Sequence, residues 1–304
     1  MKPLAPICLV AYKRPYTTWL VLKALAANPL AQQSHLIVYV DAPKSNAPEQ
    51  VVKDNLLVKA ILRSHPWCKT VEIVERSENL GVIPNVLDAI TQTVNQYGKV
   101  IFLEDDVVVS SGYLAFMNKM LDWYEKDERV MMVSGYTHPI APEDLPSYFF
   151  IKASGTPWGF ATWQRAWQHF EGNPDTLVSA IRAKQGEAAF NFHSPYIRRF
   201  QALKALAKGT CPLQLWFLRF TASIFIQDGY GIYPSKSLVT NIGNDAAKSN
   251  RLDFSSFNIP ITSKLEAKKK LAVVHHEIAL ERLIHYIKEN GKNEVKLFLE
   301  ADSQ

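Results

Sequence analysis

Three acidic residues stand side by side at the end of a short apolar run, because Glu104-Asp105-Asp106 directly follows Ile101-Phe102-Leu103. Adjacent carboxylates repel one another, so a cation is their natural partner. Carboxylate oxygens are hard ligands that suit Mg²⁺ or Mn²⁺. Such an ion can bridge to a diphosphate and offset the charge on a departing phosphate. A solvated turn with chance acids and the acidic pocket of a phosphorylatable receiver domain are the other interpretations.

Length and composition limit the kind of protein that carries this motif. The chain has 304 residues, of which 47% are apolar and 21% charged, and its formal net charge is +5. This composition predicts one or two folded domains and excludes wholesale disorder. The small basic excess suits a protein that handles phosphates or lies near an anionic membrane, and composition scatter explains it equally well. It is too small to indicate a nucleic acid partner.

The sequence contains no run of 18 apolar residues, so we expect no transmembrane helix. No small-residue cleavage site follows the first apolar stretch, and we therefore expect no secretory signal. The three cysteines, Cys8, Cys68 and Cys211, are scattered and form no CxxC pair. This usage predicts reduced thiols in a cytoplasmic protein.

Apolar runs alternate with helical segments through the first 135 residues. Buried strands are predicted at 7–11, 36–40, 71–74, 100–103 and 130–135, and helices at 17–27, 51–64, 83–97 and 112–126. This alternation predicts an α/β fold with helices on both faces of a mostly parallel sheet. Ligands bind beyond the carboxyl ends of the strands in such sheets. Asp41, Asn79 and the acidic triplet all follow predicted strands, so one edge of the sheet concentrates the polar chemistry.

Several motifs, taken in order along the chain, resemble those of one enzyme family. The acidic triplet is similar to the DxD-type signature of GT-A glycosyltransferases, in the Glu-Asp-Asp form of the N-acetylglucosaminyltransferase I-like group and its bacterial family 2-like relatives. Further similar segments are VAYKRP at 10–15, VYVD at 38–41, NLGVIPN at 79–85, SGTPWGFATW at 154–163 and YPSKSLVTNIGND at 233–245. The resemblance spans residues 5–250 and implies a GT-A fold and inverting transfer from a nucleotide sugar.

The resemblance also implies roles for individual residues. Asp106 would hold Mn²⁺ or Mg²⁺ directly, and Asp41 would accept a hydrogen bond from the base or ribose. The residues that would bind the donor are Ala11, Tyr12, Arg14, Asp41, Asn79, Asn85, Glu104, Asp105, Trp158 and Gly159. Plainer interpretations stay open: Arg14 as a helix cap or ion-pair partner, Asp41 as a strand terminator and Asn79 as a turn residue.

Glycosyl transfer also needs a general base that deprotonates the acceptor hydroxyl. In the similar enzymes an acid lies just before a Trp that leads into a helix, but here Gln214 and Leu215 precede Trp216. Glutamine cannot act as a base. Either another acid serves, or the acceptor is activated otherwise, or the protein binds without transferring. The acids considered for the first case are Asp228, Glu171 and Asp175.

Two further groups of residues have both a functional and a structural interpretation. Trp158 could stack on a sugar ring, and Gly159 would let a ligand approach the backbone. Trp163 and Trp167 are spaced for one face of a helix in the core. The histidines and acids at 275–285 match no metal motif. They belong to a predicted basic amphipathic helix at 265–289, which is either a solvated surface, the favoured interpretation, or a contact with anionic lipid.

These inferences define an expected organisation and function. Residues 1–150 would bind the nucleotide sugar, 151–260 would form the acceptor side of the same domain, and 261–304 a helical tail. We expect a UDP-sugar donor, a glycan or lipid-linked acceptor, and a role in bacterial surface polysaccharide or lipopolysaccharide synthesis at the cytoplasmic side of the inner membrane. The alternatives are a nucleotide-sugar or glycan binder with weak or lost activity, and a sugar nucleotidyltransferase. The latter would need a glycine-rich loop where this chain has 11–15.

Overall fold

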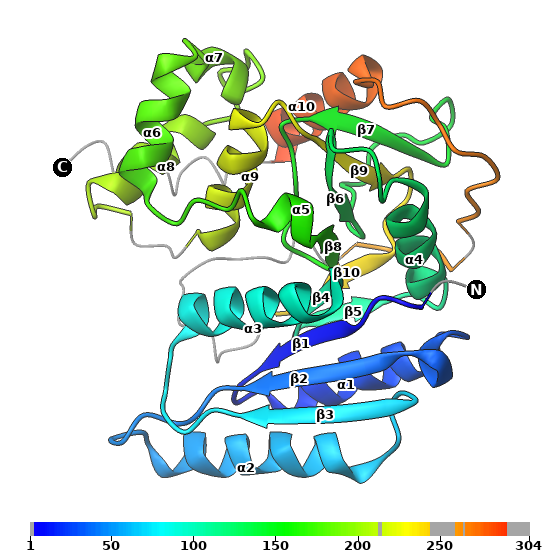
Figure 1. The fold of residues 1–304 in the computed structure, drawn as a ribbon, viewed down its shortest axis with the longest axis vertical. Helices are drawn as coiled ribbons and strands as arrows, with labels where there is room; N and C mark the ends of the chain where they lie inside the picture. Colours follow the sequence, from blue (N-terminus) through cyan, green and yellow to red (C-terminus); the bar gives the residue numbers. More distant parts are fainter. Residues whose placement is uncertain (1–2, 212–214, 244–258, 264, 291–304) are drawn as a thin grey trace.

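The computed structural model of the protein describes residues 3–211, 215–243, 259–263 and 265–290. Its centre is an eight-stranded sheet in the order β3-β2-β1-β4-β8-β6-β9-β7, and helices cover both faces (Figure 1). Strands β8 and β7 run antiparallel to their neighbours, and the other six share one direction. The predicted α/β fold with a mostly parallel sheet is therefore confirmed.

The first half of the sheet follows the predicted alternation closely. Its strands are β1 (Ile7–Ala11), β2 (His35–Val40), β3 (Thr70–Glu75) and β4 (Lys99–Glu104), and its helices are α1 (Pro15–Ala26), α2 (Glu49–Ser64) and α3 (Val82–Tyr97), with a short 3₁₀ turn, η1 (Ala31–Gln33). Helix α1 begins two residues earlier than predicted, because the fixed φ of Pro15 suits a first helical position. Strand β1 lies between β2 and β4, so the strand order reverses there.

The second half of the chain adds four strands to the same sheet and a separate two-stranded ribbon. The sheet strands are β6 (Val130–Ser134), β7 (Tyr148–Lys152), β8 (Phe160–Trp163) and β9 (Tyr230–Pro234), while β5 (Val107–Val109) pairs antiparallel with β10 (Val239–Asn241). Strands β5, β7, β8 and β10 were not predicted. Trp163 ends β8, whereas Trp167 ends the short helix α5 (Gln164–Trp167), so the predicted shared helix face was wrong. Both side chains are nevertheless buried.

The remaining helices lie around this second half. They are α4 (Tyr113–Trp123), α6 (Pro174–Ala183), α7 (Glu187–Phe190), α8 (Arg199–Ala207), α9 (Trp216–Ile226) and α10 (Glu277–Asn290). Helices α6 to α9 share a small core of their own that includes Leu177, Phe200 and Ala222. None of the helices within the described residues combines the length and the hydrophobicity needed to cross a bilayer.

The predicted helix at 265–289 was wrong over its first half. The helix starts only at Glu277, and the described residues before it run beside the sheet, where the backbone N–H of His276 donates to the carbonyl of Phe150. The hydroxyls of Tyr124 and Tyr148 accept hydrogen bonds from the N–H of Leu271. The aromatic hydroxyls and the sheet thus hold this segment extended, although its composition suits a helix.

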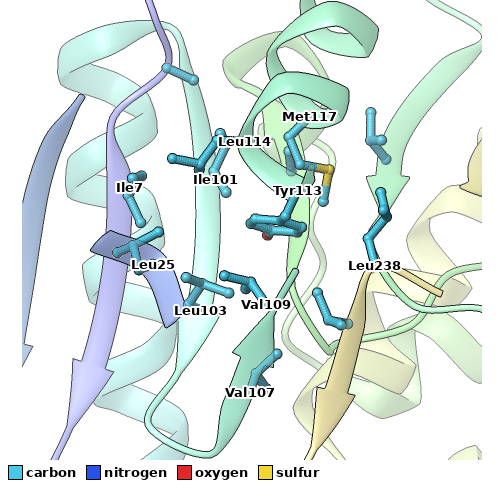
Figure 2. Packing of buried hydrophobic residues seen from close by; sticks show 14 of the residues in the cluster. Ile7, Leu25, Ile101, Leu103, Val107, Val109, Tyr113, Leu114, Met117 and Leu238 are labelled. Atoms are coloured by element: carbon cyan, nitrogen blue, oxygen red, sulfur yellow. The ribbon is translucent and has the colours of Figure 1, made fainter. Parts of the chain in front are cut away.

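The largest hydrophobic core anchors the connection that carries the acidic triplet. Leu103 and Val107, which flank the triplet, are fully buried. Figure 2 shows them packed among side chains from β1, β5, α1 and α4, and the labelled neighbours are Ile7, Leu25, Ile101, Val109, Tyr113, Leu114, Met117 and Leu238. Because both ends of the connection are held in the core, the acids between them have a defined position.

Candidate active site

The acidic triplet forms the tight connection between β4 and β5. Glu104 is the last residue of β4, and Asp105 and Asp106 are only 8% and 9% exposed. Strands β1 and β4 are the neighbours at which the strand order reverses, and crevices at such points are where open α/β sheets bind ligands. The predicted concentration of polar chemistry at this edge is therefore built around the turn after β4.

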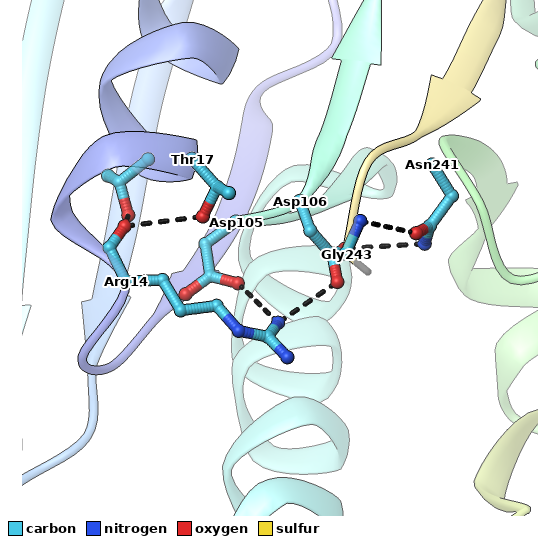
Figure 3. A network of polar contacts seen from close by, with 7 residues as sticks. Arg14, Thr17, Asp105, Asp106, Asn241 and Gly243 are labelled. Atoms are coloured by element: carbon cyan, nitrogen blue, oxygen red, sulfur yellow. Dashed lines mark hydrogen bonds and ion pairs between the residues drawn. The ribbon is translucent and has the colours of Figure 1, made fainter. Parts of the chain in front are cut away.

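Arg14 bridges two of the three carboxylates. Its Nη1 lies 3.2 Å from Oδ1 of Asp105 and 2.9 Å from Oδ2 of Asp106 (Figure 3). Arg14 follows β1 and immediately precedes α1, so the end of the strand and the start of the helix together aim its side chain at the turn after β4. Residues separated by about 90 positions in the sequence thus form one charged cluster.

Burial and mutual repulsion disturb the ionisation of the acidic triplet. Desolvation, followed by the charges of Asp106 and Asp105, raises the pKa of Glu104 to about 8. Desolvation also raises the pKa of Asp105 to about 6, although the neighbouring Arg14 opposes this shift. Additional positive charge would stabilise the ionised forms of both groups. The cluster therefore has the chemistry of a cation site that one guanidinium neutralises only in part.

The triplet suits a divalent ion that is shared with a substrate. The described residues contain no group of three or more His, Cys, Asp or Glu side chains arranged to hold a metal. Mg²⁺ in phosphate-transfer sites commonly takes one or two carboxylates from the protein and its other ligands from phosphates and water. Asp106, together with Asp105, provides such a partial set of hard oxygen ligands for Mn²⁺ or Mg²⁺.

A segment 135 residues further along the chain encloses the other side of Asp106. Asn241 lies opposite Val107 in the β10–β5 pair, and the N–H of Ile242 donates to the carbonyl of Asp106 at 2.9 Å. The side-chain amide of Asn241 lies 3.4 Å from Oδ1 of Asp106 and accepts from the N–H of Gly243 at 2.8 Å. A Cβ at Gly243 would lie 2.1 Å from Oδ2 of Asp106, so the fit requires glycine.

Asn241 and Gly243 were not identified as site residues from the sequence. Their segment entered the argument only as part of a resemblance, and the three-residue strand that delivers them gives no periodic signal. The pairing of β10 with β5 places them, and this pairing is a long-range feature.

Asp41 holds the loop that follows β3. Its Oδ1 accepts the N–H groups of Ala42 at 3.0 Å and Leu80 at 2.8 Å. Its Oδ2 accepts the N–H of Gly81 at 3.0 Å and the side-chain amide of Asn79 at 3.2 Å. These four bonds satisfy both oxygens of a carboxylate that is 5% exposed, and they position the start of α3. A direct contact of Asp41 or Asn79 with a nucleotide stays a prediction.

Asn55 of α2 is a positioning residue that the sequence did not reveal. Its side-chain amide donates to the carbonyl of Tyr12 at 2.7 Å and to that of Asp41 at 2.9 Å. The side chain is 1% exposed and ties together the ends of β1 and β2. The available signal was a single amide on the otherwise apolar inner face of α2, beside Val58 and Leu62.

Asn85 lies in the first turn of α3 and is engaged by Arg76. The Nε of Arg76 donates to Oδ1 of Asn85 at 2.9 Å, and its guanidinium also pairs with Asp88 and lies over the ring of Tyr39. Asn85 is 4% exposed, so its amide oxygen serves the protein interior. The predicted contact of Asn85 with the donor is not tested by this geometry.

Trp158 and Gly159 lie behind the β5–β10 ribbon. The ring of Trp158 packs edge-on against Tyr136, with 4.8 Å between the ring centroids. Gly159 has a φ of +57°, and a Cβ there would lie 2.9 Å from a methyl carbon of Val239. Close packing against β10 therefore explains the glycine, and sugar stacking by Trp158 stays a prediction.

The three candidate bases are not brought to the acidic triplet. The side chain of Trp216, at the start of α9, hydrogen-bonds Glu104. The 11 residues of α9 span about 16 Å, and Asp228 lies beyond the far end, where it pairs with Lys152 at 3.0 Å and Lys184 at 2.7 Å.

Glu171 and Asp175 belong to the connection between α5 and α6. An oxygen of Glu171 accepts the N–H of Asn173, and its own N–H donates to Ser223, two turns along α9 from Trp216. Asp175 lies in the first turn of α6. Gln214, which occupies the position expected for an acid, lies outside the described residues.

Comparison with known proteins finds similarity at the level of structure only. No protein-family model matches the chain, and no curated protein matches it either. The mannosyltransferase PcManGT from Pyrobaculum calidifontis, solved in complex with GDP-Man and Mn²⁺, superposes with a TM-score of 0.40 at 14% identity, covering 74% of each chain.

Two further solved structures overlap less well. S. aureus TarS gives a TM-score of 0.34 at 11% identity, covering 54% of this chain and 28% of its own. Mannose-1-phosphate geranyltransferase from Thermus thermophilus gives 0.34 at 11%, covering 77% and 74%. The overlap of the chain paths is partial in each case, and the functional argument rests on the residues of the site.

Proposed function

We propose that the protein is a metal-dependent, inverting glycosyltransferase that moves a sugar from a nucleotide sugar to a glycan or lipid-linked acceptor. The observation that supports this proposal is the acidic triplet at the switch point of the sheet, bridged by Arg14 and enclosed by Asn241 and Gly243. Asp106, with Asp105, would hold Mn²⁺ or Mg²⁺. When bound, the ion neutralises the diphosphate and so assists departure of the nucleotide.

The chain's own residues would divide the remaining tasks. The end of β1, from Ala11 to Tyr12, would line the nucleotide, and Glu104 with Trp216 would lie beside the donor sugar. We propose a UDP-sugar that carries a hexose or an N-acetylhexosamine, and a setting in bacterial surface polysaccharide or lipopolysaccharide synthesis. The resemblance of the sequence motifs supports these finer assignments.

The proposal is tested by thermal melting with a panel of nucleotide sugars, each with Mn²⁺ and with chelator, followed by transfer assays. A ligand at 100 times its dissociation constant adds about 2.7 kcal/mol to the free energy of unfolding and raises Tm by several degrees. Asp106→Asn should abolish the ion-dependent shift, whereas Asp54→Asn, on the solvent side of α2, should keep it. An intact shift in Asp106→Asn would refute the metal assignment.

One observation favours a second candidate, a nucleotide-sugar binder that transfers weakly or not at all. Asp228, Glu171 and Asp175 all lie away from the acidic triplet, as described above. A binder would show the ion-dependent melting shift but release no nucleotide when acceptors are supplied. Nucleotide release that depends on an acceptor would exclude it.

Peripheral contact with a membrane would suit a lipid-linked acceptor, and α10 does not supply a surface for it. The apolar side of α10 packs on the sheet, with Ala279 fully buried against a cluster that includes Phe149. On α1, by contrast, Tyr16 is 69% exposed, and Lys23 lies over the partly exposed ring of Trp19. We propose this face of α1 as the contact. Loss of sedimentation with anionic vesicles in Trp19→Ser would support it, and unchanged sedimentation would refute it.

A further inference from the structure

We propose that Arg14 is a built-in counter-cation of the metal site, which leaves the carboxylates only when a divalent ion and a diphosphate bind together. The inference rests on the proposed function, because it concerns the same ion and the same donor. It starts from one contact: a single nitrogen, Nη1, lies 3.2 Å from Asp105 and 2.9 Å from Asp106. These are the two carboxylates that would hold the ion.

The ion and the guanidinium cannot share this position. Mg²⁺ and its larger relatives sit about 2.0–2.6 Å from carboxylate oxygens, which places them in the space that Nη1 occupies. The far side of Asp106 is closed, because Asn241 lies 3.4 Å from Oδ1 and the Cα of Gly243 packs against Oδ2. Two positive charges this close would also repel each other strongly. Binding of the ion therefore requires the guanidinium to move.

The backbone at Arg14 is fixed, whereas its side chain has room to turn. The carbonyl of Arg14 accepts the N–H of Thr18 at 3.0 Å and the hydroxyls of Thr17 and Thr18, which ties it to the first turn of α1 (Figure 3). The side chain itself is 22% exposed. A rotation about the side-chain bonds can thus take the guanidinium off the carboxylates without disturbing the strand or the helix.

The displaced guanidinium needs a new anionic partner, and a diphosphate is the group that the donor would bring. Arginine forms strong, two-pronged hydrogen bonds with phosphate oxygens. An ion that binds alone would break the ion pairs of Arg14 without replacing them, whereas ion and diphosphate together would replace them. Metal and nucleotide should therefore bind cooperatively, and each should raise the affinity of the other by the same factor.

The test measures binding of Mn²⁺ to the full chain from the electron paramagnetic resonance signal of the free ion, first alone and then with UDP. Arg14→Met should bind Mn²⁺ alone about tenfold more tightly than the wild type, which corresponds to about 1.4 kcal/mol. The enhancement produced by UDP should shrink in the same variant. Arg14→Lys keeps the charge and should stay near the wild type. Arg182→Met, an exposed arginine on α6 that pairs with Glu187, is the matched control and should not change either quantity.

Equal or weaker binding of Mn²⁺ by folded Arg14→Met would overturn the proposal. If that variant fails to fold, the wild type still decides, because equal affinity for Mn²⁺ with and without UDP would also overturn it. The arm with Mn²⁺ alone needs no donor. Tighter binding in Arg14→Met together with no sugar transfer would therefore support the role of Arg14 and count against glycosyl transfer.

Discussion

Replacement of Gly243 by alanine should separate the site from the fold. An added Cβ would lie 2.1 Å from Oδ2 of Asp106, 2.8 Å from its Cγ and 3.1 Å from Oδ1 of Asn241. Carbon and oxygen atoms that are not bonded pack at well over 3 Å, so the carboxylate or the segment that carries Gly243 must shift by about 1 Å. A misplacement of this size in a reacting constellation costs about 100-fold in rate.

The assay compares ion-dependent donor binding and the initial rate of transfer between Gly243→Ala and the wild type. Gly172→Ala is the matched control, because a Cβ there would meet only Phe170 at an ordinary 3.7 Å. We expect Gly243→Ala to lose about 100-fold in rate and to weaken binding, while its melting temperature in the presence of chelator stays close to that of the control. Wild-type binding and rate in Gly243→Ala would show that the contact of this segment with Asp106 does not shape the site.

Three further predictions follow from the same geometry. Asn55→Ala leaves two buried carbonyls without their donor and should lower the free energy of unfolding by about 1–3 kcal/mol in urea titrations, whereas exposed Asn95→Ala should change it little. Folding raises the pKa of Glu104 from 4.5 to about 8, so the folded protein keeps a proton that the unfolded chain releases; Tm measured with chelator should therefore fall as pH rises from 4.5 to 8, and Glu104→Gln should flatten this slope. For the same reason Mn²⁺ should bind more tightly as pH rises through this range, and affinity that is flat with pH would contradict the assignment. Asp228→Asn removes two exposed ion pairs far from the acidic triplet; it should cost at most about 1 kcal/mol and leave transfer unchanged, and a large loss of activity would restore Asp228 as the candidate base.

The parts of the fold that could be predicted are those that local periodicity encodes. Strand β1 is buried at every position, and α3 carries its apolar residues at helical spacing, so both were predicted to within one residue. The short strands β5 and β10 have three residues each, too few for a periodic pattern. The extended segment before α10 shows the opposite failure: its composition suits a helix, and hydrogen bonds to Tyr124 and Tyr148 hold it extended.

The same division applies to the candidate site. The acidic triplet was identifiable because its character is local: three carboxylates follow a buried strand, and their repulsion calls for a cation whatever the surroundings. The partners of the triplet depend on strand order and register, which arise from contacts between distant segments. Asn241 reaches Asp106 only because β10 pairs with β5, and Asp228 is kept away from it only because α9 runs toward the opposite end of the sheet.

The amino-acid sequence by itself therefore determined the alternation of strands and helices, the parallel sheet and the edge where the acids gather, since each depends on residue type and spacing over a few turns of chain. Tertiary structure alone decided that Arg14 lies between Asp105 and Asp106, that Gly243 has no room for a side chain, and that Asp41 is satisfied by the loop after β3. The physical reason is that ion pairs, close contacts and buried hydrogen bonds act over a few ångströms in space, and the sheet order decides which residues come within that range.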